Sequence, residues 1–155
     1  MDFATLLMRF TAAVEAGDGS ALGAVFTEDG VYHDTFYGEF QGRAAIKDML
    51  ENYFWRDAEA FRWDMHDPVA TADKGYARWV FSYTSKLPEA AGKRCVFEGM
   101  SLFRLENGLI RHYGEVFDQG IALVQTAFPP ERIARIVGRS AERLRTRVAG
   151  SRHLT

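Results

Sequence analysis

Apolar and polar residues alternate along four segments in the second half of the chain, and short turns separate these segments. A period of two residues is typical of a β-strand that buries one face. The four segments cover residues 61–65, 76–87, 94–105 and 109–118, and the turns between them are TADKG, PEAAGK and ENG. Hairpin-sized turns between successive strands predict an antiparallel meander, and this meander restricts the fold more than any other feature.

Helical spacing of apolar residues dominates before the meander. It predicts helices around residues 3–14, 22–26 and 46–54, while TEDG is interpreted as a turn and VYHDTFY as a short strand. After the meander, FPP at 128–130 ends a short helix, and a last helix carries Ile133, Val137, Leu144 and Val148 on one stripe. Helices on one side of an antiparallel sheet predict an α+β domain. We expect a cone-shaped, curved antiparallel sheet that the N-terminal helices close, with an extra C-terminal helix.

The composition fits one globular domain. The chain has 155 residues, of which 47% are hydrophobic, and this is enough for a single core. No apolar run is long enough to span a membrane, and the first residues lack the pattern of a secretory leader. Cys95 is the only cysteine, so a reducing compartment is the simplest location. We therefore expect a cytoplasmic protein without a membrane partner.

Charge is distributed unevenly along the chain. Residues 129–155 contain seven arginines and two glutamates, although the whole chain has a net charge of −2. We therefore divide the domain into a body, residues 1–128, and a basic helical extension, residues 129–155. A basic helix can bind nucleic acid or an anionic membrane, but no nucleic-acid-binding motif accompanies these arginines. We expect no nucleic-acid partner, and we expect the helix to dock through its apolar stripe.

Three patches of the chain resemble the nuclear transport factor 2-like superfamily, specifically its SnoaL-like branch. They are RFTAAVEAGDGSALGAVFTEDGVYHD, GRAAIKDML and FRLENGLIRHYGEVFDQGIALVQ, and the resemblance runs from about Leu6 to about Gln125. It implies the cone fold. The superfamily includes ketosteroid isomerases, limonene epoxide hydrolases, polyketide cyclases, dehydratases and non-catalytic binding proteins, so the resemblance leaves the activity open.

The comparison with ketosteroid isomerases implies a role for Asp34 but not the usual reaction. Asp34 lies where these enzymes have their general base, whereas Phe10 and Ser101 occupy the positions of their two oxyanion donors. Phenylalanine donates no hydrogen bond, and serine is a weaker donor than a carboxylic acid. Since loss of one such donor typically slows a reaction about 100- to 1000-fold, efficient ketosteroid isomerisation is not expected.

The other two enzyme classes give one mismatch and one partial match. Trp79 and Phe81 stand where the epoxide hydrolases pair an arginine with an aspartate. The resemblance to polyketide cyclases places their acid/base aspartate at Glu115 and their histidine partner at Ser101. The carboxylate is therefore retained in chemical type, while its partner is not.

Strand parity indicates which side chains can meet inside the cone. Tyr113, Glu115 and Phe117 share one face of their strand, so a pocket-facing Glu115 would stand among aromatic rings that raise its pKa. Glu115 in an ion pair with an arginine or at the rim is the alternative. For Asp34 the alternative is a turn carboxylate that binds local backbone amides. His33 would face away from Asp34 and is interpreted as structural.

We expect Asp34 and Glu115 to be the catalytic residues if the protein is an enzyme. The expected substrate-binding residues are aromatic or hydroxyl side chains of the interior, namely Phe10, Tyr32, Trp63, Trp79, Phe81, Tyr83, Ser101, Phe103, Tyr113 and Phe117. The histidines at 33, 66 and 112 have no metal-binding spacing. We therefore expect neither a metal nor a cofactor.

Two classes of function stay open. The first is a cofactor-independent acid/base enzyme, of isomerase, cyclase or dehydratase type, for a small and mostly apolar carbonyl, polyketide or terpenoid compound. The second is a non-catalytic module that binds a small hydrophobic ligand or dimerises. In both cases we expect a homodimer, because Val96, Met100 and Leu102 form a second apolar face on their strand.

Overall fold

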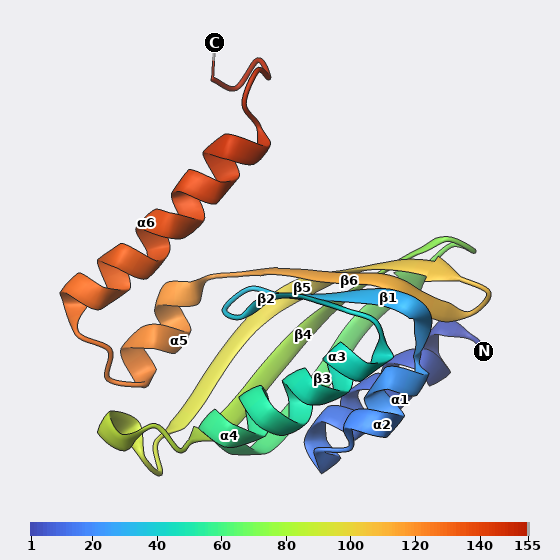
Figure 1. Cartoon of the computed structure of the whole chain (residues 1–155), viewed down its shortest axis with the longest axis horizontal. Coiled ribbons are helices and arrows are strands. Elements are labelled where there is room, and N and C mark those ends of the chain that lie inside the picture. Colours follow the sequence, from blue (N-terminus) through green and yellow to red (C-terminus); the bar gives the residue numbers. More distant parts are fainter. Residues whose placement is uncertain (155) are drawn as a thin grey trace.

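The computed structural model describes residues 1–154, which form a curved six-stranded sheet with helices against its concave side (Figure 1). The helices are α1 (Phe3–Ala16), α2 (Gly19–Ala24), α3 (Arg43–Met49), α4 (Trp55–Asp57), α5 (Gln119–Gln125) and α6 (Pro130–Arg147), with a π-helical turn at Leu50–Phe54 and a 3-10 turn at Pro88–Ala90. The strands are β1 (Phe26–Asp34), β2 (Gly38–Gln41), β3 (Ala58–Ala70), β4 (Lys74–Ser85), β5 (Arg94–Glu106) and β6 (Leu109–Phe117). The α+β cone with its extra C-terminal helix is as the sequence predicts.

The predicted meander is present as β3 to β6, and the strand order across the sheet is β2-β1-β6-β5-β4-β3. One pair departs from the predicted antiparallel arrangement, since β1 lies parallel to β6. The physical reason is that no hairpin joins these two strands. A tight turn forces antiparallel pairing, whereas β1 and β6 are separated in the chain by helices and by the strands β2 to β5.

The first strand is longer than the sequence predicts. Phe26 begins β1 instead of ending a helix, and TEDG lies within the strand, where the register with β6 shifts between Phe26 and Val31. Polar residues at this irregularity face solvent, so their turn-like composition does not end the strand. A short partner strand, β2, was also not predicted. It pairs His33 with Glu39 and Asp34 with Gly38.

The core consists of apolar side chains from one face of the helices and from the concave face of the sheet. Phe10 of α1 is fully buried, and its ring packs against the rings of Tyr32, Trp63, Phe103 and Tyr113 at centroid distances of 5.0–6.0 Å. These partners come from four different strands. A single helix face therefore holds the two ends of the curved sheet at a fixed distance, which shapes the cone.

A glycine on the concave face lets an indole ring lie flat against the sheet. A Cβ atom at Gly99 would come within 2.6 Å of Cζ2 of Trp79 and within 2.6 Å of the carbonyl oxygen of Val116. No side chain fits at this distance. Gly99 therefore fixes the position of the Trp79 ring, which lines the candidate site described below.

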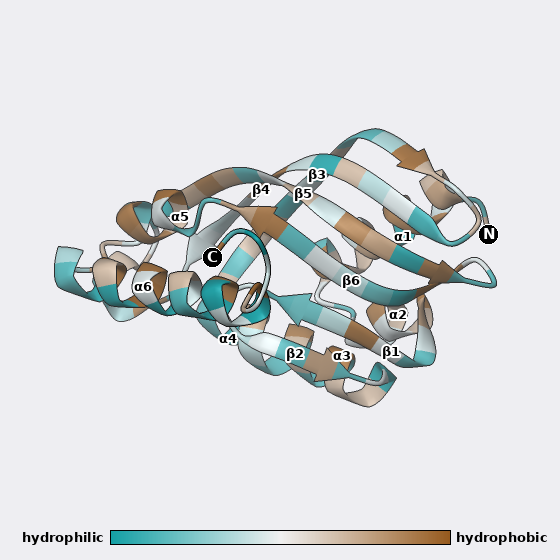
Figure 2. Cartoon of the chain, turned by 90° about the horizontal axis from the view of Figure 1, so that it is seen from above, coloured by the Kyte–Doolittle hydropathy of each residue, from teal (hydrophilic) through white to brown (hydrophobic). Residues whose placement is uncertain are grey.

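The C-terminal helix does not dock as the sequence predicts. In Figure 1, α6 projects away from the sheet, and none of its residues is buried. Val137 and Leu144 of the apolar stripe are 42% and 49% exposed, so the expected docking of this stripe on the body is wrong. The helix is held instead by a polar contact, in which the Ser140 hydroxyl donates to Oε1 of Gln119 at 2.5 Å. Figure 2 shows hydrophilic and hydrophobic residues mixed along α6.

Within residues 1–154, no helix is both long enough and apolar enough to cross a membrane.

We predict that Gly99→Val destabilises the protein by about 1–3 kcal/mol, because the added atoms must displace the Trp79 ring or the β6 backbone. Urea unfolding measures this change. Gly138→Ala is the matched control, since a Cβ atom there meets nothing within 4 Å and replaces glycine inside a helix. The control should be neutral or slightly stabilising. Equal stability of Gly99→Val and the wild type would contradict the role given to Gly99.

Candidate active site

A pocket of about 560 Å³ opens on the concave side of the sheet, within the volume range of small-molecule sites. Aromatic side chains are the largest group in its wall. Six of the predicted binding residues line it, namely Tyr32, Trp63, Trp79, Phe81, Tyr83 and Phe117. A ligand in this pocket would lose much of its contact with water. Electrostatic interactions between the ligand and the pocket would therefore be stronger than in water.

Three carboxyl groups line this pocket, and two of them, those of Asp34 and Glu115, lie close to each other on β1 and β6. Asp34 ends β1 and is only 5% exposed, and its Oδ1 accepts hydrogen bonds from the backbone N–H groups of Phe36 and Tyr37, both at 2.8 Å. The two interpretations of Asp34 are therefore both correct in geometry: it caps a turn and it faces the pocket. The turn fixes the carboxyl group through one oxygen and leaves the other free of hydrogen bonds from residues 1–154.

Glu115 is held by hydrogen bonds rather than by an ion pair. Its Oε2 accepts a hydrogen bond from the Tyr113 hydroxyl at 2.8 Å, and its Oε1 accepts one from the backbone N–H of Thr35 at 3.2 Å. No arginine among the described residues forms an ion pair with it. Thr35 directly follows Asp34, so this contact also ties the two carboxyl groups to each other.

A chain of hydrogen bonds runs from the core to Glu115. The indole N–H of Trp79 donates to Oγ of Ser101 at 2.8 Å, and the Ser101 hydroxyl donates to Oη of Tyr113 at 2.9 Å. Tyr113 then donates to Glu115. Burial and the nearby Glu115 raise the pKa of Tyr113 well above its ordinary value. The Tyr113 hydroxyl therefore stays protonated and is the donor of this hydrogen bond. Each member of this relay polarises the next.

Burial raises the pKa of both carboxyl groups, and their other contacts make the two values differ. Loss of water raises the pKa of Asp34 to about 6, against the opposing effect of its two backbone hydrogen bonds. Loss of water, and then the charge of Asp34, raise the pKa of Glu115 to about 8. The first proton to leave the pair therefore leaves mainly from Asp34. At neutral pH the pair therefore holds one carboxylate and one carboxylic acid.

Four of the predicted binding residues do not line the pocket. Phe10 and Phe103 are fully buried in the core beneath it, because the helix α1 fills that end of the cone. Ser101 and Tyr113 are also fully buried, and they reach the site only through the relay to Glu115. The structure thus places these four side chains behind the wall of the pocket, where they position its surface and do not form it.

Three features of the pocket were not predicted. The Tyr37 hydroxyl donates to Oδ2 of Asp57 at 2.7 Å, and both residues line the pocket. The indole N–H of Trp63 is the one buried side-chain donor without a partner within residues 1–154. Three arginines of α6, at 132, 139 and 143, reach the pocket as well. Only the last feature had a signal in the sequence, which was the basic character of the extension.

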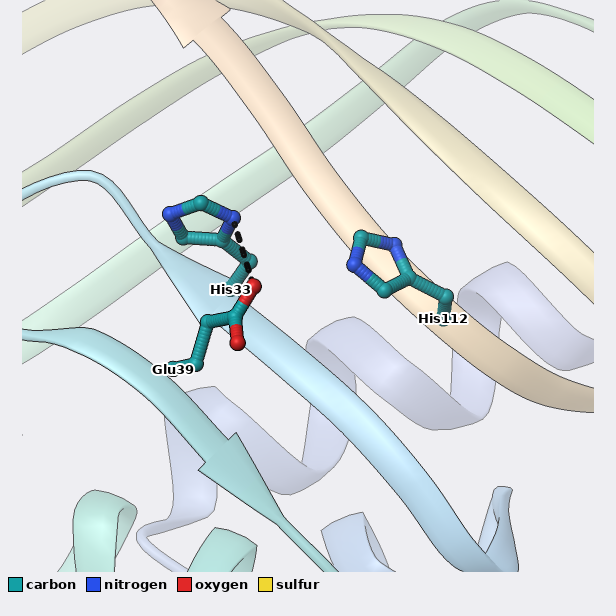
Figure 3. Close-up of side chains that lie close together, drawn as sticks. All are labelled: His33, Glu39 and His112. Carbon is teal, nitrogen blue, oxygen red and sulfur yellow. Dashed lines mark ion pairs between the residues drawn. The ribbon is translucent and has the colours of Figure 1, made fainter. Parts of the chain in front are cut away.

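One group of potential metal ligands lies outside the pocket. Figure 3 shows His33, Glu39 and His112, whose ligand atoms all lie within 4.8 Å of one another. Nδ1 of His33 is 3.5 Å from Oε1 of Glu39, and partial burial, followed by the charge of His33, lowers the pKa of His112. These side chains are on the outer sheet face, since His33 alternates with Asp34 and His112 with Tyr113. The absence of a metal site stays a prediction.

Comparison with known proteins gives a family and a fold. A model of the SnoaL-like domain matches residues 7–113. A search of curated proteins found no match.

Solved structures with a similar fold include the following three. One is a protein with a ketosteroid isomerase-like fold from Catenulispora acidiphila, in complex with trimethylamine, at 20% identity and a TM-score of 0.73, covering 81% of this chain and 95% of that one. A protein described as a polyketide cyclase from Xanthomonas campestris has 22% identity and a TM-score of 0.65, with 80% and 96% covered. An epoxide hydrolase of limonene-hydrolase type from Mycobacterium tuberculosis has 16% identity and a TM-score of 0.65, with 86% and 94% covered. At these identities the likeness shows the fold alone.

We predict that Glu115→Gln weakens the pH dependence of stability between pH 4.5 and about 8. In this window the folded wild type keeps the Glu115 proton that the unfolded chain has lost. The free energy of unfolding therefore falls as pH rises, by up to about 1.4 kcal/mol per pH unit, and the loss is complete above the folded pKa. The glutamine has the shape of the protonated acid and keeps one acceptor oxygen, but it does not titrate, so a smaller slope should remain from Asp34.

Urea unfolding across this pH window checks the prediction. Glu51→Gln is the control, because Glu51 is exposed on the π-helical turn Leu50–Phe54 and should leave the wild-type slope unchanged. If Glu115→Gln and the wild type lose stability at the same rate with rising pH, Glu115 is not protonated in the folded state.

Proposed function

Because the chain belongs to the SnoaL-like domain family, we propose that it is a cofactor-independent acid/base enzyme that moves a proton on a small, mostly apolar carbonyl compound of polyketide or terpenoid type. The observation that carries the proposal is the pair of carboxyl groups in an aromatic pocket, with the pKa of Asp34 raised to about 6 and that of Glu115 to about 8. Two acids whose environments separate their pKa values can serve as base and acid at the same pH.

The pKa order assigns the roles. Near pH 7 Asp34 is mainly ionised, so it is the base that takes a proton from the carbon next to the substrate carbonyl. Glu115 is mainly protonated, so it is the acid that gives a proton to the carbonyl oxygen, and an enol results. Return of a proton to a different carbon gives isomerisation, and attack of the enol carbon on a second carbonyl gives cyclisation. Both outcomes begin with the same transfer.

Two further groups support a carbonyl substrate. The buried indole N–H of Trp63 lacks an acceptor, and an unpaired buried donor costs about 1–3 kcal/mol. A carbonyl oxygen at the inner end of the pocket would supply that acceptor. The relay from Trp79 through Ser101 and Tyr113 holds Glu115 in place, which limits the reorganisation needed when its proton moves.

Ketosteroid isomerisation is not part of the proposal. Phe10 is a core residue without a donor, and the Ser101 hydroxyl is already engaged with Trp79 and Tyr113. The two residues at the donor positions of the steroid reaction therefore offer no free hydrogen-bond donor to a bound ligand. A non-catalytic ligand-binding module is the alternative, and it corresponds to the outcome in which ligands bind but no proton is exchanged.

We predict that the wild type accelerates exchange of the protons next to the carbonyl group when cyclic ketones and β-keto esters are incubated in D2O. Proton NMR measures the exchange, and the natural substrate need not be known. Asp34→Asn and Glu115→Gln should each lower the rate by about 100-fold or more, since positioned acid/base groups contribute at least this much. The exposed Glu51→Gln is the matched control and should retain the wild-type rate.

The same assay has an expected pH profile. The rate should rise as Asp34 ionises around pH 6 and fall as Glu115 loses its proton around pH 8, which gives a bell-shaped curve. Ligand binding without exchange in the wild type, at any pH, would favour the binding module over the enzyme.

We also propose a homodimer that forms through the outer face of β5 and β6. Val96, Met100 and Val116 are 48%, 52% and 78% exposed there, and Met100 pairs directly with Val116 across the two strands. Leu102, the third residue named from the sequence, is only partly exposed. An apolar group of this kind on a central pair of strands is typical of a protein–protein interface.

Sedimentation tests the dimer. The wild type should have twice the 17.5 kDa mass of one chain, and Met100→Asp with Val116→Asp should shift it to the mass of the monomer. The exposed Met8→Asp serves as a control because Met8 lies on α1, on the opposite side of the sheet from this face, and should leave the mass unchanged. A wild type that sediments as a monomer at micromolar concentration would rule out the interface.

A further inference from the structure

The part of α6 next to the pocket presents a basic face to it. Arg132, Ile136, Arg139 and Arg143 all line the pocket, and their spacing of four, three and four residues puts them on one side of the helix. This side differs from the apolar stripe that the sequence analysis singled out. The mouth of an otherwise aromatic pocket therefore carries three guanidinium groups.

Local contacts hold this basic face at the mouth. The guanidinium of Arg132 lies 4.5 Å from the centre of the Phe128 ring, and Nη2 of Arg143 donates to Oγ of Ser140 at 2.9 Å. Ser140 in turn donates to Gln119, a buried residue at the start of α5 that also lines the pocket. The contacts join α6 to the pocket wall through neutral groups, so they leave the positive charges uncompensated.

The three arginines have no acidic partner. Among the described part of the chain, no carboxylate lies within 4.0 Å of Arg132, Arg139 or Arg143, although other arginines do form ion pairs. Three carboxyl groups, those of Asp34, Asp57 and Glu115, line the rest of the pocket, and the ionised ones would repel an anion that entered fully. An anionic group is therefore favoured at the mouth and disfavoured at the inner end, so an elongated anion would bind in one orientation.

We infer that the substrate is an amphipathic anion, with an apolar body that carries the reacting carbonyl and a carboxylate or phosphate group that the arginines of α6 hold at the mouth. This inference rests on the proposed function for the site but adds the charge of the ligand. It also gives the C-terminal extension a role as the selectivity element of the pocket. The match to the family model ends at residue 113, before α5 and α6 begin, so this element belongs to the part of the chain outside that match.

Binding of four ten-carbon probes tests the inference on the full chain. The probes are decanoate, decyl phosphate, 2-decanone and decyltrimethylammonium, each used below the concentration at which it forms micelles. Two of the three tryptophans, Trp63 and Trp79, line the pocket, so tryptophan fluorescence reports entry of a ligand. The wild type should bind at least one of the two anions roughly ten-fold more tightly than 2-decanone, since each arginine contact contributes modestly. The cation should bind most weakly.

A pair of variants with equal loss of charge separates the pocket from the helix as a whole. The triple change R132Q/R139Q/R143Q should abolish the preference for the anion and leave binding of 2-decanone unchanged. The control R135Q/R145Q/R152Q removes three arginines that do not line the pocket and should keep the preference. Because α6 has no buried residue, neither variant should unfold the body. The anion that binds more tightly identifies the group as carboxylate or phosphate.

Several results would overturn the inference. They are equal binding of anions and 2-decanone by the wild type, equal loss of preference in both variants, or an effect of the pocket variant on binding to anionic vesicles or DNA but not to either anionic probe. The proposed acid/base function fails separately. It fails if Asp34→Asn and Glu115→Gln exchange substrate protons as fast as the wild type, and that outcome leaves the anion preference intact.

Discussion

The register between β5 and β6 is the constraint on which the rest of the site depends. It pairs Ser101 with Glu115 and Phe103 with Tyr113, so the relay of hydroxyl groups lies beside the carboxyl group that it holds. A slip of one residue would turn Glu115 to the outer face and bring Val116 into the pocket. The tight turn at Asn107 and Gly108, both with positive φ, fixes this register at the end of the hairpin.

Burial of two carboxyl groups in one aromatic pocket costs stability that a purely structural core would not lose. The chain limits this cost by local means, with two backbone N–H groups for Asp34, and one backbone N–H group and one hydroxyl for Glu115. None of these donors is charged. They fix the positions of the carboxyl oxygens without returning the pKa values to the ordinary range, which is the condition under which one group can be an acid and the other a base.

The helices at the two ends of the chain have different physical tasks. Helix α1 buries Phe10 among rings from four strands and closes the narrow end of the cone, whereas α6 buries nothing and stands at the open end. The apolar stripe of α6 predicted a docked helix, because periodicity shows that a face is apolar but not what covers it. The contact that forms instead uses Ser140 and Gln119, two polar residues that no hydrophobic pattern connects.

The sequence by itself determined the α+β class, the meander and the pocket-facing parity of Tyr113, Glu115 and Phe117, because these follow from periods of two and of three to four residues along the chain. It also indicated Asp34 and Glu115 through a resemblance to known enzymes. Only the tertiary structure decided the parallel pairing of β1 with β6, the contact that ties Thr35 to Glu115 and the reach of the α6 arginines to the mouth. The first two of these join segments 80 or more residues apart, and no local pattern encodes the distance between two such segments.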